Sequence, residues 1–272
     1  MKKEQEYAKK SFDAVANNYD EIAFFKTSAK YVCEMIQSHT RRKDLKVLDV
    51  ACGTGNVVLE CASHLKDSKF TAIDISEGML AKAKENADAK GLTNIEFQLQ
   101  DITKLNLDKK YHIITCSYAL FFLPNAPRVL ENLASLLTSR GIVIFTSFTE
   151  KAFAPSNEIL LAILTKYGSQ TAKEYDMHKW ENLKTRSHIE RLCTLSYVTD
   201  MKIQAKEIGY GMNIDEWWEL VNNTGYKGML MELSSENYEK VKSEYYEAML
   251  KHADMDGEVQ LVADTYFTVV SK

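Results

Sequence analysis

Three features are missing from this sequence of 272 residues: a long apolar run, a closely spaced cysteine pair and a run of one charge. A membrane span needs roughly 20 consecutive apolar residues, and no apolar signal-peptide core follows the polar start from Met1 to Glu6. We therefore expect a cytoplasmic protein that has no membrane partner. Acidic and basic residues nearly balance, with 38 against 34, so nothing in the charge pattern attracts nucleic acid.

The five cysteines are scattered, odd in number and without a Cys-x-x-Cys pair. Such spacing favours neither a disulfide framework nor a thiolate zinc site. We expect the cysteines to be reduced and mostly buried, and we expect no metal site. They are Cys33, Cys52, Cys61, Cys116 and Cys193.

Short β-branched runs alternate with helical periodicity from residue 45 to about 148, as they do in βαβ units that form a parallel sheet. The composition, 45% hydrophobic and 26% charged, is that of a globular protein and excludes disordered and collagen-like classes. The sequence therefore predicts an α/β fold. The strands expected in this part are 46–50, 70–74, 95–99, 112–116 and 142–146.

The remaining segments follow from the same periodicity signals. Within the core, a helix is expected from Asn125 to about Ser139, with Leu136 and Leu137 on its apolar stripe. After residue 150 the regular alternation stops, and two strand-like runs flank a helical excursion that we interpret as a lid insertion over the sheet. These two runs are 201–208 and 260–270. The expected division is an N-terminal helical segment that covers the binding site (1–40), a binding core (41–150), a helical extension with the sixth strand (151–208), the lid insertion (209–257) and the last strand of the sheet (258–272).

The most informative segment is a glycine turn that follows the first expected strand, Val47-Leu48-Asp49-Val50-Ala51-Cys52-Gly53-Thr54-Gly55. Glycine lets the backbone approach a ligand closely, and the helix start that follows supplies free N–H groups. A dinucleotide fingerprint would need a third glycine where Val58 stands, and the sequence has no Gly-Lys-Ser or Gly-Lys-Thr of a phosphate-binding loop. Asp49, four residues before Gly53, would repel a pyrophosphate but suits a cationic ligand.

This glycine turn resembles the first motif of class I S-adenosylmethionine-dependent methyltransferases. The run Ala72-Ile73-Asp74-Ile75-Ser76-Glu77-Gly78-Met79-Leu80 resembles the second motif of their ubiquinone/menaquinone-methyltransferase-like branch, which acts on small molecules. Residues 100–102, 116–120 and 140–141 match further. The resemblance implies a Rossmann-like doubly wound sheet of seven strands, mostly parallel with an antiparallel last strand. It also implies S-adenosylmethionine as the cofactor and S-adenosylhomocysteine as the product.

The resemblance assigns cofactor contacts residue by residue. Asp74 ends the second strand 21 residues after Gly53, where a carboxylate accepts both hydroxyls of a ribose. Asp49 should lie near the cofactor's ammonium group, and Asp101 should receive the adenine amino group. The other expected contacts are Ile75, Met79 and the Ile102 N–H at the adenine, Gly53, Thr54 and Gly55 at the methionine portion, Tyr19 folded over the cofactor, and Ala51, Gln100, Cys116 and Ser117 around it.

Several of these residues also have a purely structural interpretation. Asp49 could be a turn carboxylate and Asp101 a loop residue. Tyr19 could be a tyrosine that an amphipathic helix buries. Cys52 and Cys116 are typical of small core residues.

The sequence identifies no general base, and methyl transfer does not demand one. Transfer from a sulfonium is an in-line displacement, so the protein mainly aligns the acceptor and excludes water. Tyr118 and His178 are the catalytic candidates. For the acceptor pocket we expect walls formed by Tyr118, Phe122, Trp217 and Trp218, with core packing as the alternative for both tryptophans. The run after Ser117 lacks the paired prolines typical of enzymes that methylate nucleobases or glutamine amides.

The sequence thus predicts methyl transfer to an oxygen, nitrogen or carbon atom of a small molecule, by a monomer or homodimer. Two alternatives from other classes stay open. One is a non-catalytic protein of the same fold that senses the cofactor. The other is a nicotinamide-dependent oxidoreductase, which Val58 and Asp49 disfavour.

Overall fold

The structure is a computed structural model that describes residues 3–105, 107–176, 178–198 and 200–271. A seven-stranded sheet forms its centre, with the strand order β3-β2-β1-β4-β5-β9-β6. Five neighbouring strands are parallel, and β9 runs antiparallel to both β5 and β6. This arrangement confirms the predicted Rossmann-like sheet of seven strands. The strands are β1 (Lys46–Val50), β2 (Lys69–Asp74), β3 (Ile95–Leu99), β4 (Tyr111–Ser117), β5 (Leu137–Phe148), β6 (Asp200–Lys206) and β9 (Thr265–Ser271).

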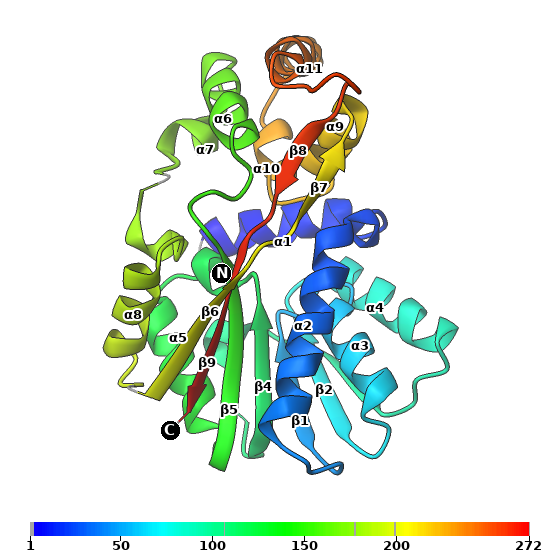
Figure 1. Cartoon of the computed structure of the whole chain (residues 1–272), viewed down its shortest axis with the longest axis vertical. Coiled ribbons are helices and arrows are strands. Elements are labelled where there is room, and N and C mark those ends of the chain that lie inside the picture. The colour runs from blue at the N-terminus through cyan, green and yellow to red at the C-terminus, as the bar shows by residue number, and fades with distance from the viewer. Residues whose placement is uncertain (1–2, 106, 177, 199, 272) are drawn as a thin grey trace.

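Helices cover both faces of the sheet because successive strand residues point to opposite sides. On β1, Val47 belongs to the core cluster that includes α2, α3 and α4, whereas Leu48 belongs to the cluster that includes α5 and α8. Figure 1 shows these two groups on opposite sides of the strands. The helices are α2 (Ala23–His39), α3 (Asn56–His64), α4 (Glu77–Ala89), α5 (Ala126–Ser135) and α8 (Arg186–Leu195).

A second layer, which we call the upper lobe, lies beyond one end of the sheet (Figure 1). Two separate segments of chain build it, because helices of the β5–β6 connection pack against helices of the β6–β9 connection. Ser156 Oγ and Tyr245 Oη share a hydrogen bond of 2.7 Å, and Lys166 pairs with Glu244 at 2.6 Å. The upper lobe consists of α6 (Ser156–Lys166), α7 (Gln170–Glu174), β7 (Gly209–Met212), α9 (Ile214–Asn222), α10 (Lys227–Leu230), α11 (Ser235–Leu250) and β8 (Val259–Val262).

One of the two expected strands of the second half is divided in the structure. The run 201–208 is a single strand, β6, which ends at Lys206 before β7 begins at Gly209, whereas the run 260–270 spans β8 and β9; β7 and β8 pair antiparallel in a separate small sheet. Between the two sheets, the Ile208 N–H donates to Asp264 Oδ1 at 3.1 Å, and the Ala263 N–H donates to the Ile208 carbonyl at 2.7 Å. The prediction of a single strand over 260–270 was wrong because an apolar run does not reveal where a chain leaves one sheet for another. Part of the segment 258–272 therefore belongs to the upper lobe.

The helix predicted from Asn125 to about Ser139 is shorter in the structure. It ends at Ser135, and Leu137 already pairs with Tyr111 as the first residue of β5. The register shifts after this pair, and a Cβ on Gly141 would lie 2.9 Å from the Tyr111 carbonyl oxygen. The apolar stripe misled because leucines that continue a helical pattern can equally begin a strand.

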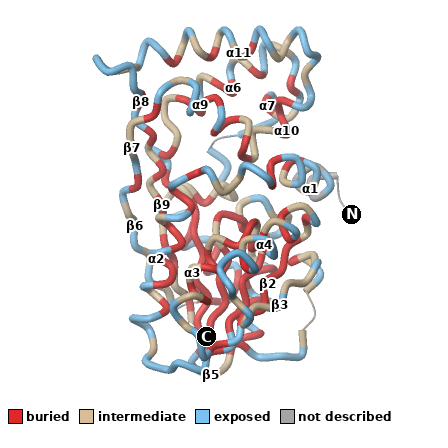
Figure 2. The backbone as a smooth tube through the Cα atoms, turned by 90° about the vertical axis from the view of Figure 1, so that its right-hand side faces the viewer, coloured by how far each residue is buried: buried red, intermediate tan, exposed pale blue. Residues whose placement is uncertain are grey.

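The N-terminal segment lies between the sheet and the upper lobe, as Figures 1 and 2 both show. As the structure has it, this segment consists of α1 (Lys3–Val15) and a 3-10 turn, η1 (Tyr19–Glu21), whereas α2, which the expected segment 1–40 included, packs against the sheet. Figure 2 places most buried residues on the sheet strands and the inner sides of the helices around them. Within the described ranges, no helix is long and apolar enough to cross a membrane.

Trp217 tests how the upper lobe is held together. Its side chain is fully buried, and its Nε1 donates to the Val259 carbonyl at 3.1 Å, which joins α9 to β8. We expect Trp217→Ala to lower the free energy of unfolding by about 3–5 kcal/mol, because a large core side chain leaves a cavity. Urea unfolding followed by circular dichroism measures the change. Met255→Ala, at a fully exposed position, should stay within about 0.5 kcal/mol of the wild type; an equally small effect at Trp217 would contradict this role.

Candidate functional site

The carboxyl ends of β1, β2 and β4 border a cavity of about 110 Å³, which we call the Asp74 cavity. This is the edge at which open α/β sheets bind their ligands. Ten predicted cofactor residues line it: Tyr19, Ala51, Gly53, Asp74, Ile75, Met79, Gln100, Asp101, Ile102 and Ser117. The remaining lining residues are Phe12, Tyr118, Ala119, Phe122 and Leu123.

The glycine turn joins β1 to α3 through backbone conformations that favour glycine. Gly53 has φ +56° and Gly55 has φ +93°, in the left-handed region that side chains disfavour. A Cβ on Gly55 would also lie 3.1 Å from the Leu59 side chain, so this residue packs α3 closely against the turn. Gly53 has more space around it, since a Cβ there would lie 4.0 Å from Tyr19 Cε1.

Asp74 holds the glycine turn against the end of β2. Its Oδ2 accepts the Gly53 N–H at 2.8 Å, and its Oδ1 accepts the Ser76 N–H at 2.9 Å. Burial raises the pKa of this carboxyl above its ordinary value, which the two backbone donors oppose. Asp74 thus connects two strand ends while its carboxylate still borders the cavity.

Asp49 is a buried carboxylate with one oxygen unpaired. Its Oδ1 accepts the Thr115 hydroxyl at 2.7 Å, whereas its Oδ2 accepts no hydrogen bond from the residues that the structure describes. Burial and the negative charge of the neighbouring Asp74 together raise the pKa of Asp49 to about 7, while the Thr115 hydroxyl and the Val58 backbone act in the opposite direction. Because an unpaired buried charge is costly, this position favours a cationic partner.

A smaller space of about 50 Å³, the Asp49 cavity, adjoins the Asp74 cavity. The two cavities share part of their walls and therefore lie side by side. The shared residues are Tyr19, Ala51, Gly53, Ser117 and Tyr118, and the Asp49 cavity adds Phe25, Ser28, Asp49, Cys52, Asn56 and Val57.

Two carboxylates that sequence reasoning missed fasten the N-terminal segment over these cavities. Asp20 accepts the Thr54 hydroxyl at 2.5 Å and the Asn86 amide at 2.6 Å. Asp13 accepts the Ser76 hydroxyl at 2.5 Å, at the start of α4. Asp20 directly follows Tyr19 in the sequence, but nothing in the neighbouring residues indicates which distant donors it meets.

Tyr19 lies at the wall of the Asp74 cavity. Its ring stacks on Phe25 with the centroids 4.7 Å apart and borders the Asp74 cavity beside Gly53. Burial raises the pKa of Tyr19 well above its ordinary range, and the negative charge of Asp74 adds to the effect. The hydroxyl therefore stays neutral and can only donate or accept hydrogen bonds.

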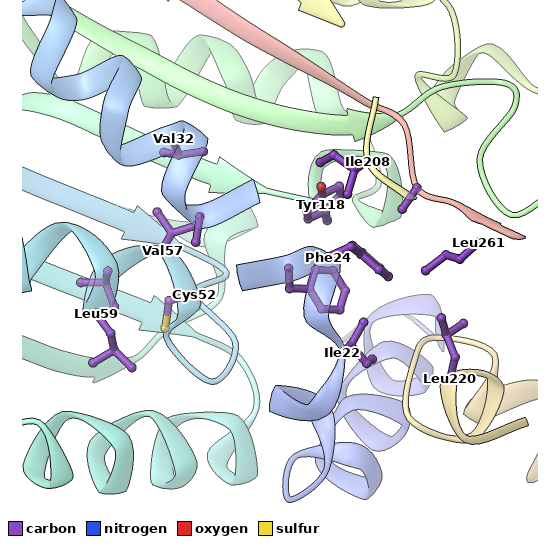
Figure 3. Close-up of a cluster of buried hydrophobic side chains, with 14 of the residues drawn as sticks. Ile22, Phe24, Val32, Cys52, Val57, Leu59, Tyr118, Ile208, Leu220 and Leu261 are labelled. Atoms are coloured by element: carbon purple, nitrogen blue, oxygen red, sulfur yellow. The ribbon is translucent and has the colours of Figure 1, made fainter. Parts of the chain in front are cut away.

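A third space of about 160 Å³, the aromatic cavity, lies under the upper lobe. It meets the Asp74 cavity at four shared residues, Phe12, Tyr19, Tyr118 and Phe122. Figure 3 shows Tyr118 close to Phe24, at the junction of the sheet and the upper lobe. The other residues that line the aromatic cavity are Phe24, Phe25, Phe121, Phe148, Ala152, Phe153, Asn157, Tyr175, Asn182, Lys184, Thr224, Gly225, Tyr226 and Met229.

Tyr118 contributes its ring to all three cavities, but its hydroxyl is engaged elsewhere. The hydroxyl is hydrogen-bonded to Ser28 and, at 2.8 Å, to Thr265 Oγ1. Burial raises the pKa of Tyr118 to about 12. Phe122 is half-exposed and forms an edge contact with Phe12, with the centroids 5.8 Å apart. These two candidate acceptor residues therefore lie at the junction of the Asp74 and aromatic cavities.

Other predicted site residues lie away from these cavities. Thr54, Gly55 and Cys116 line none of the three; Cys116 is buried in the core, where burial raises the pKa of its thiol. His178 is exposed, and its backbone N–H donates to Asp176 Oδ1 at 2.9 Å. The structure thus does not bring this histidine to the site.

The two tryptophans are the main correction to the predicted acceptor pocket. Trp217 is fully buried against β8, and Trp218 packs against Tyr238 and Tyr245 of α11 with centroids 5.5 and 5.6 Å apart. Neither borders the aromatic cavity. Core packing, the alternative interpretation, describes both of them.

Comparisons with known proteins identify the family of this chain. A family model described as a methyltransferase domain matches residues 41–215. The malonyl-[acyl-carrier protein] O-methyltransferase of Bacillus cereus is 29% identical over 146 residues, which cover 53% of this chain and 53% of that protein. The chain thus spans about half the length of the curated relatives it matches.

Solved structures share the fold at lower identity. The YcgJ protein from Bacillus subtilis has a TM-score of 0.58 at 15% identity, covering 88% of this chain and 96% of that chain. The plantazolicin methyltransferase BpumL, solved with a triazolic desmethylPZN analog and SAH, has a TM-score of 0.54 at 17% identity, covering 95% and 89%.

The raised pKa of Asp49 predicts a pH-dependent stability. Between pH of about 4 and 7 the folded protein keeps a proton on Asp49 that the unfolded chain has released, so its contribution to stability falls as pH rises through this window. Asp49→Asn removes the titration. We expect its free energy of unfolding, relative to the wild type, to rise by about 1–3 kcal/mol from pH 5 to pH 8.

Urea unfolding at pH 5 and pH 8 measures this difference. Asp67→Asn makes the same chemical change at an exposed position and should follow the wild type at both pH values. A difference between Asp49→Asn and the wild type that stays constant with pH would disprove the assignment.

Proposed function

The chain belongs to the methyltransferase-domain family, and we propose that it transfers a methyl group from S-adenosylmethionine to an oxygen, nitrogen or carbon atom of a small molecule. The observation that carries this proposal is the unpaired, buried Oδ2 of Asp49 beside the glycine turn. A site with an unmatched carboxylate suits the cationic methionine end of this cofactor and would repel a pyrophosphate. This argues against the nicotinamide alternative.

We infer that Asp74 binds the ribose. Its two oxygens already accept backbone N–H groups, so the carboxylate is held in one orientation and its remaining lone pairs border the cavity. Ile75 and Met79, which line the same cavity, would contact the adenine. Asp101 also lines it; its Oδ1 accepts the Thr103 N–H at 2.9 Å, which orients the carboxyl for the adenine amino group.

At the other end of the cofactor, Asp49 would pair with the ammonium group. Pairing with a cation favours the charged carboxylate, so binding would lower the pKa of Asp49 and release its proton. The backbone at Gly53 and Ser117 borders both cavities and would direct the sulfur toward Tyr118. When bound, the cofactor supplies an activated methyl group on a sulfonium.

The chain's own contribution to the reaction is alignment and exclusion of water. The acceptor would occupy the aromatic cavity and meet the methyl group at the four residues that the two cavities share. Phe12 and Tyr19 close this junction from the N-terminal segment, which Asp13 and Asp20 fasten to the core. We assign no catalytic base, because the Tyr118 hydroxyl is occupied by Ser28 and Thr265.

The cytoplasmic location and the monomeric or homodimeric state expected from the sequence stay predictions. Size-exclusion chromatography with light scattering would determine the oligomeric state.

Cofactor binding tests the site directly. Isothermal titration with S-adenosylmethionine and S-adenosylhomocysteine should show binding to the wild type. Asp74→Ala should weaken it at least about tenfold, because charge-assisted hydrogen bonds to the ribose are lost, and Gly53→Val should abolish it by filling the cavity. Gly91→Val is the matched control: it strains a glycine with a similar φ of +64° where a Cβ would meet nothing within 4 Å.

Two results would overturn the site assignment. One is wild-type affinity in both Asp74→Ala and Gly53→Val. The other is an equal loss in Gly91→Val, since it would trace the effect to backbone strain. Binding of NAD in the same titration would favour the oxidoreductase.

A methyl-transfer assay separates the enzyme from the sensor. Phenols, amines and carboxylates are incubated with the protein and S-adenosylmethionine labelled on its methyl group, and labelled products are counted. We expect transfer to at least one class. Tight cofactor binding with no transfer to any of them would favour the non-catalytic alternative.

A further inference from the structure

Four polar residues form a part of the wall of the aromatic cavity that we call its polar end. Asn157, Asn182, Lys184 and Thr224 line this cavity, and none of them lines the Asp74 cavity. They come from α6, from the connection before α8 and from the loop between α9 and α10. Both segments that build the upper lobe thus contribute to the polar end.

Lys184 is the one charged side chain among the described residues that line the aromatic cavity. No carboxylate in the described part of the chain lies within ion-pair distance of it. Burial lowers the pKa of Lys184, while the negative charge of Glu158 partly opposes this. A partly buried ammonium group without an ion-pair partner, bordering a cavity rich in aromatic rings, favours an anionic ligand.

Thr224 gives a second, independent indication. Its Oγ1 is buried and has no hydrogen-bond partner among the described residues, although buried hydroxyls are normally paired. The nearby amides, in contrast, are already engaged: Asn157 Oδ1 accepts the Tyr226 hydroxyl at 2.8 Å, and Asn182 Nδ2 donates to the Asp176 carbonyl at 2.7 Å. The polar end thus offers one ammonium and one hydroxyl with unused donors.

We propose that this polar end binds a carboxylate on an aromatic acceptor, with Lys184 as the counter-ion and Thr224 as a hydrogen-bond donor. The inference rests on the proposed function and narrows its substrate class to aromatic acids. The bound carboxylate is an anchor and not the methylated group, because Lys184 and Thr224 lie outside the cavity where the methyl group is expected. In this arrangement the aromatic ring of the acceptor lies between the polar end and the Asp74 cavity, against the aromatic walls. It presents a second functional group at Tyr118 and Phe122.

Matched carboxylates and carboxamides test the proposal. The pairs are benzoate with benzamide, phenylacetate with phenylacetamide, and 2-naphthoate with 2-naphthamide, which differ in charge but hardly in shape. Their dissociation constants are measured by ligand-observed NMR on protein saturated with S-adenosylhomocysteine. We expect at least one carboxylate to bind about tenfold more tightly than its amide, as a charge-assisted hydrogen bond predicts.

Variants assign the preference to the polar end. Lys184→Met keeps most of the side-chain length and should abolish the preference, whereas Lys184→Arg should retain it. Lys179→Met removes the same charge at an exposed neighbour that does not line the cavity and should behave as the wild type. Thr224→Val should weaken carboxylate binding severalfold without lowering stability, since it removes an unpaired buried hydroxyl.

Three results would overturn the proposal: no carboxylate binds, carboxylate and amide bind equally, or the preference survives Lys184→Met. Binding of S-adenosylhomocysteine is measured first for every variant, so a misfolded variant is recognised. If the wild type binds the cofactor but shows no preference for the carboxylate, the anion site is rejected and the proposed function stays intact. If the wild type binds no cofactor, the proposed function fails, and the same pairs are titrated against the protein alone, where the same criteria apply.

Discussion

The hydrogen bond from the Gly53 N–H to Asp74 Oδ2 is the contact on which the site depends. It joins the turn after β1 to the end of β2, so two strand ends that are neighbours in the sheet also share one ligand-facing edge. Burial of both Asp74 and Asp49 is costly and raises the pKa of each carboxyl, and the Gly53 N–H opposes this effect at Asp74. Two buried acids beside a cavity are an arrangement that a cationic ligand stabilises and an empty site does not.

The N-terminal segment connects this edge with the aromatic cavity. Phe12 and Tyr19 line both spaces, and Asp13 and Asp20 attach the segment to the starts of α4 and α3. Both attachments are hydrogen bonds from hydroxyl or amide groups to carboxylates, without a buried ion pair, so they hold the segment without a large desolvation cost. The same segment thus forms part of the wall of both cavities.

The sequence predicted the features that local chemistry determines. The strands of the core, the positive-φ glycines and Asp74 at a strand end each follow from a few adjacent residues. The contacts of Asp13 and Asp20 could not be predicted in this way, since their partners stand more than 30 residues away. The same holds for the upper lobe: the expected lid insertion lacked α6 and α7, because only tertiary packing, such as Ser156 against Tyr245, assigns them to it.

The error at Trp217 and Trp218 has a physical reason that also bears on where we propose the acceptor site. Adjacent residues on a helix point about 100° apart, so two buried tryptophans in succession mark a helix covered on two sides. Here α9 lies between β8, through the Trp217 bond to Val259, and α11, through Trp218 and Tyr245. The two adjacent tryptophans therefore indicate that α9 is an interior helix of the upper lobe. A ligand cavity needs polar groups in its wall that have no partner within the protein. Among the described residues of the proposed acceptor site, these groups are Lys184 and the Thr224 hydroxyl, which no apolar sequence pattern reveals.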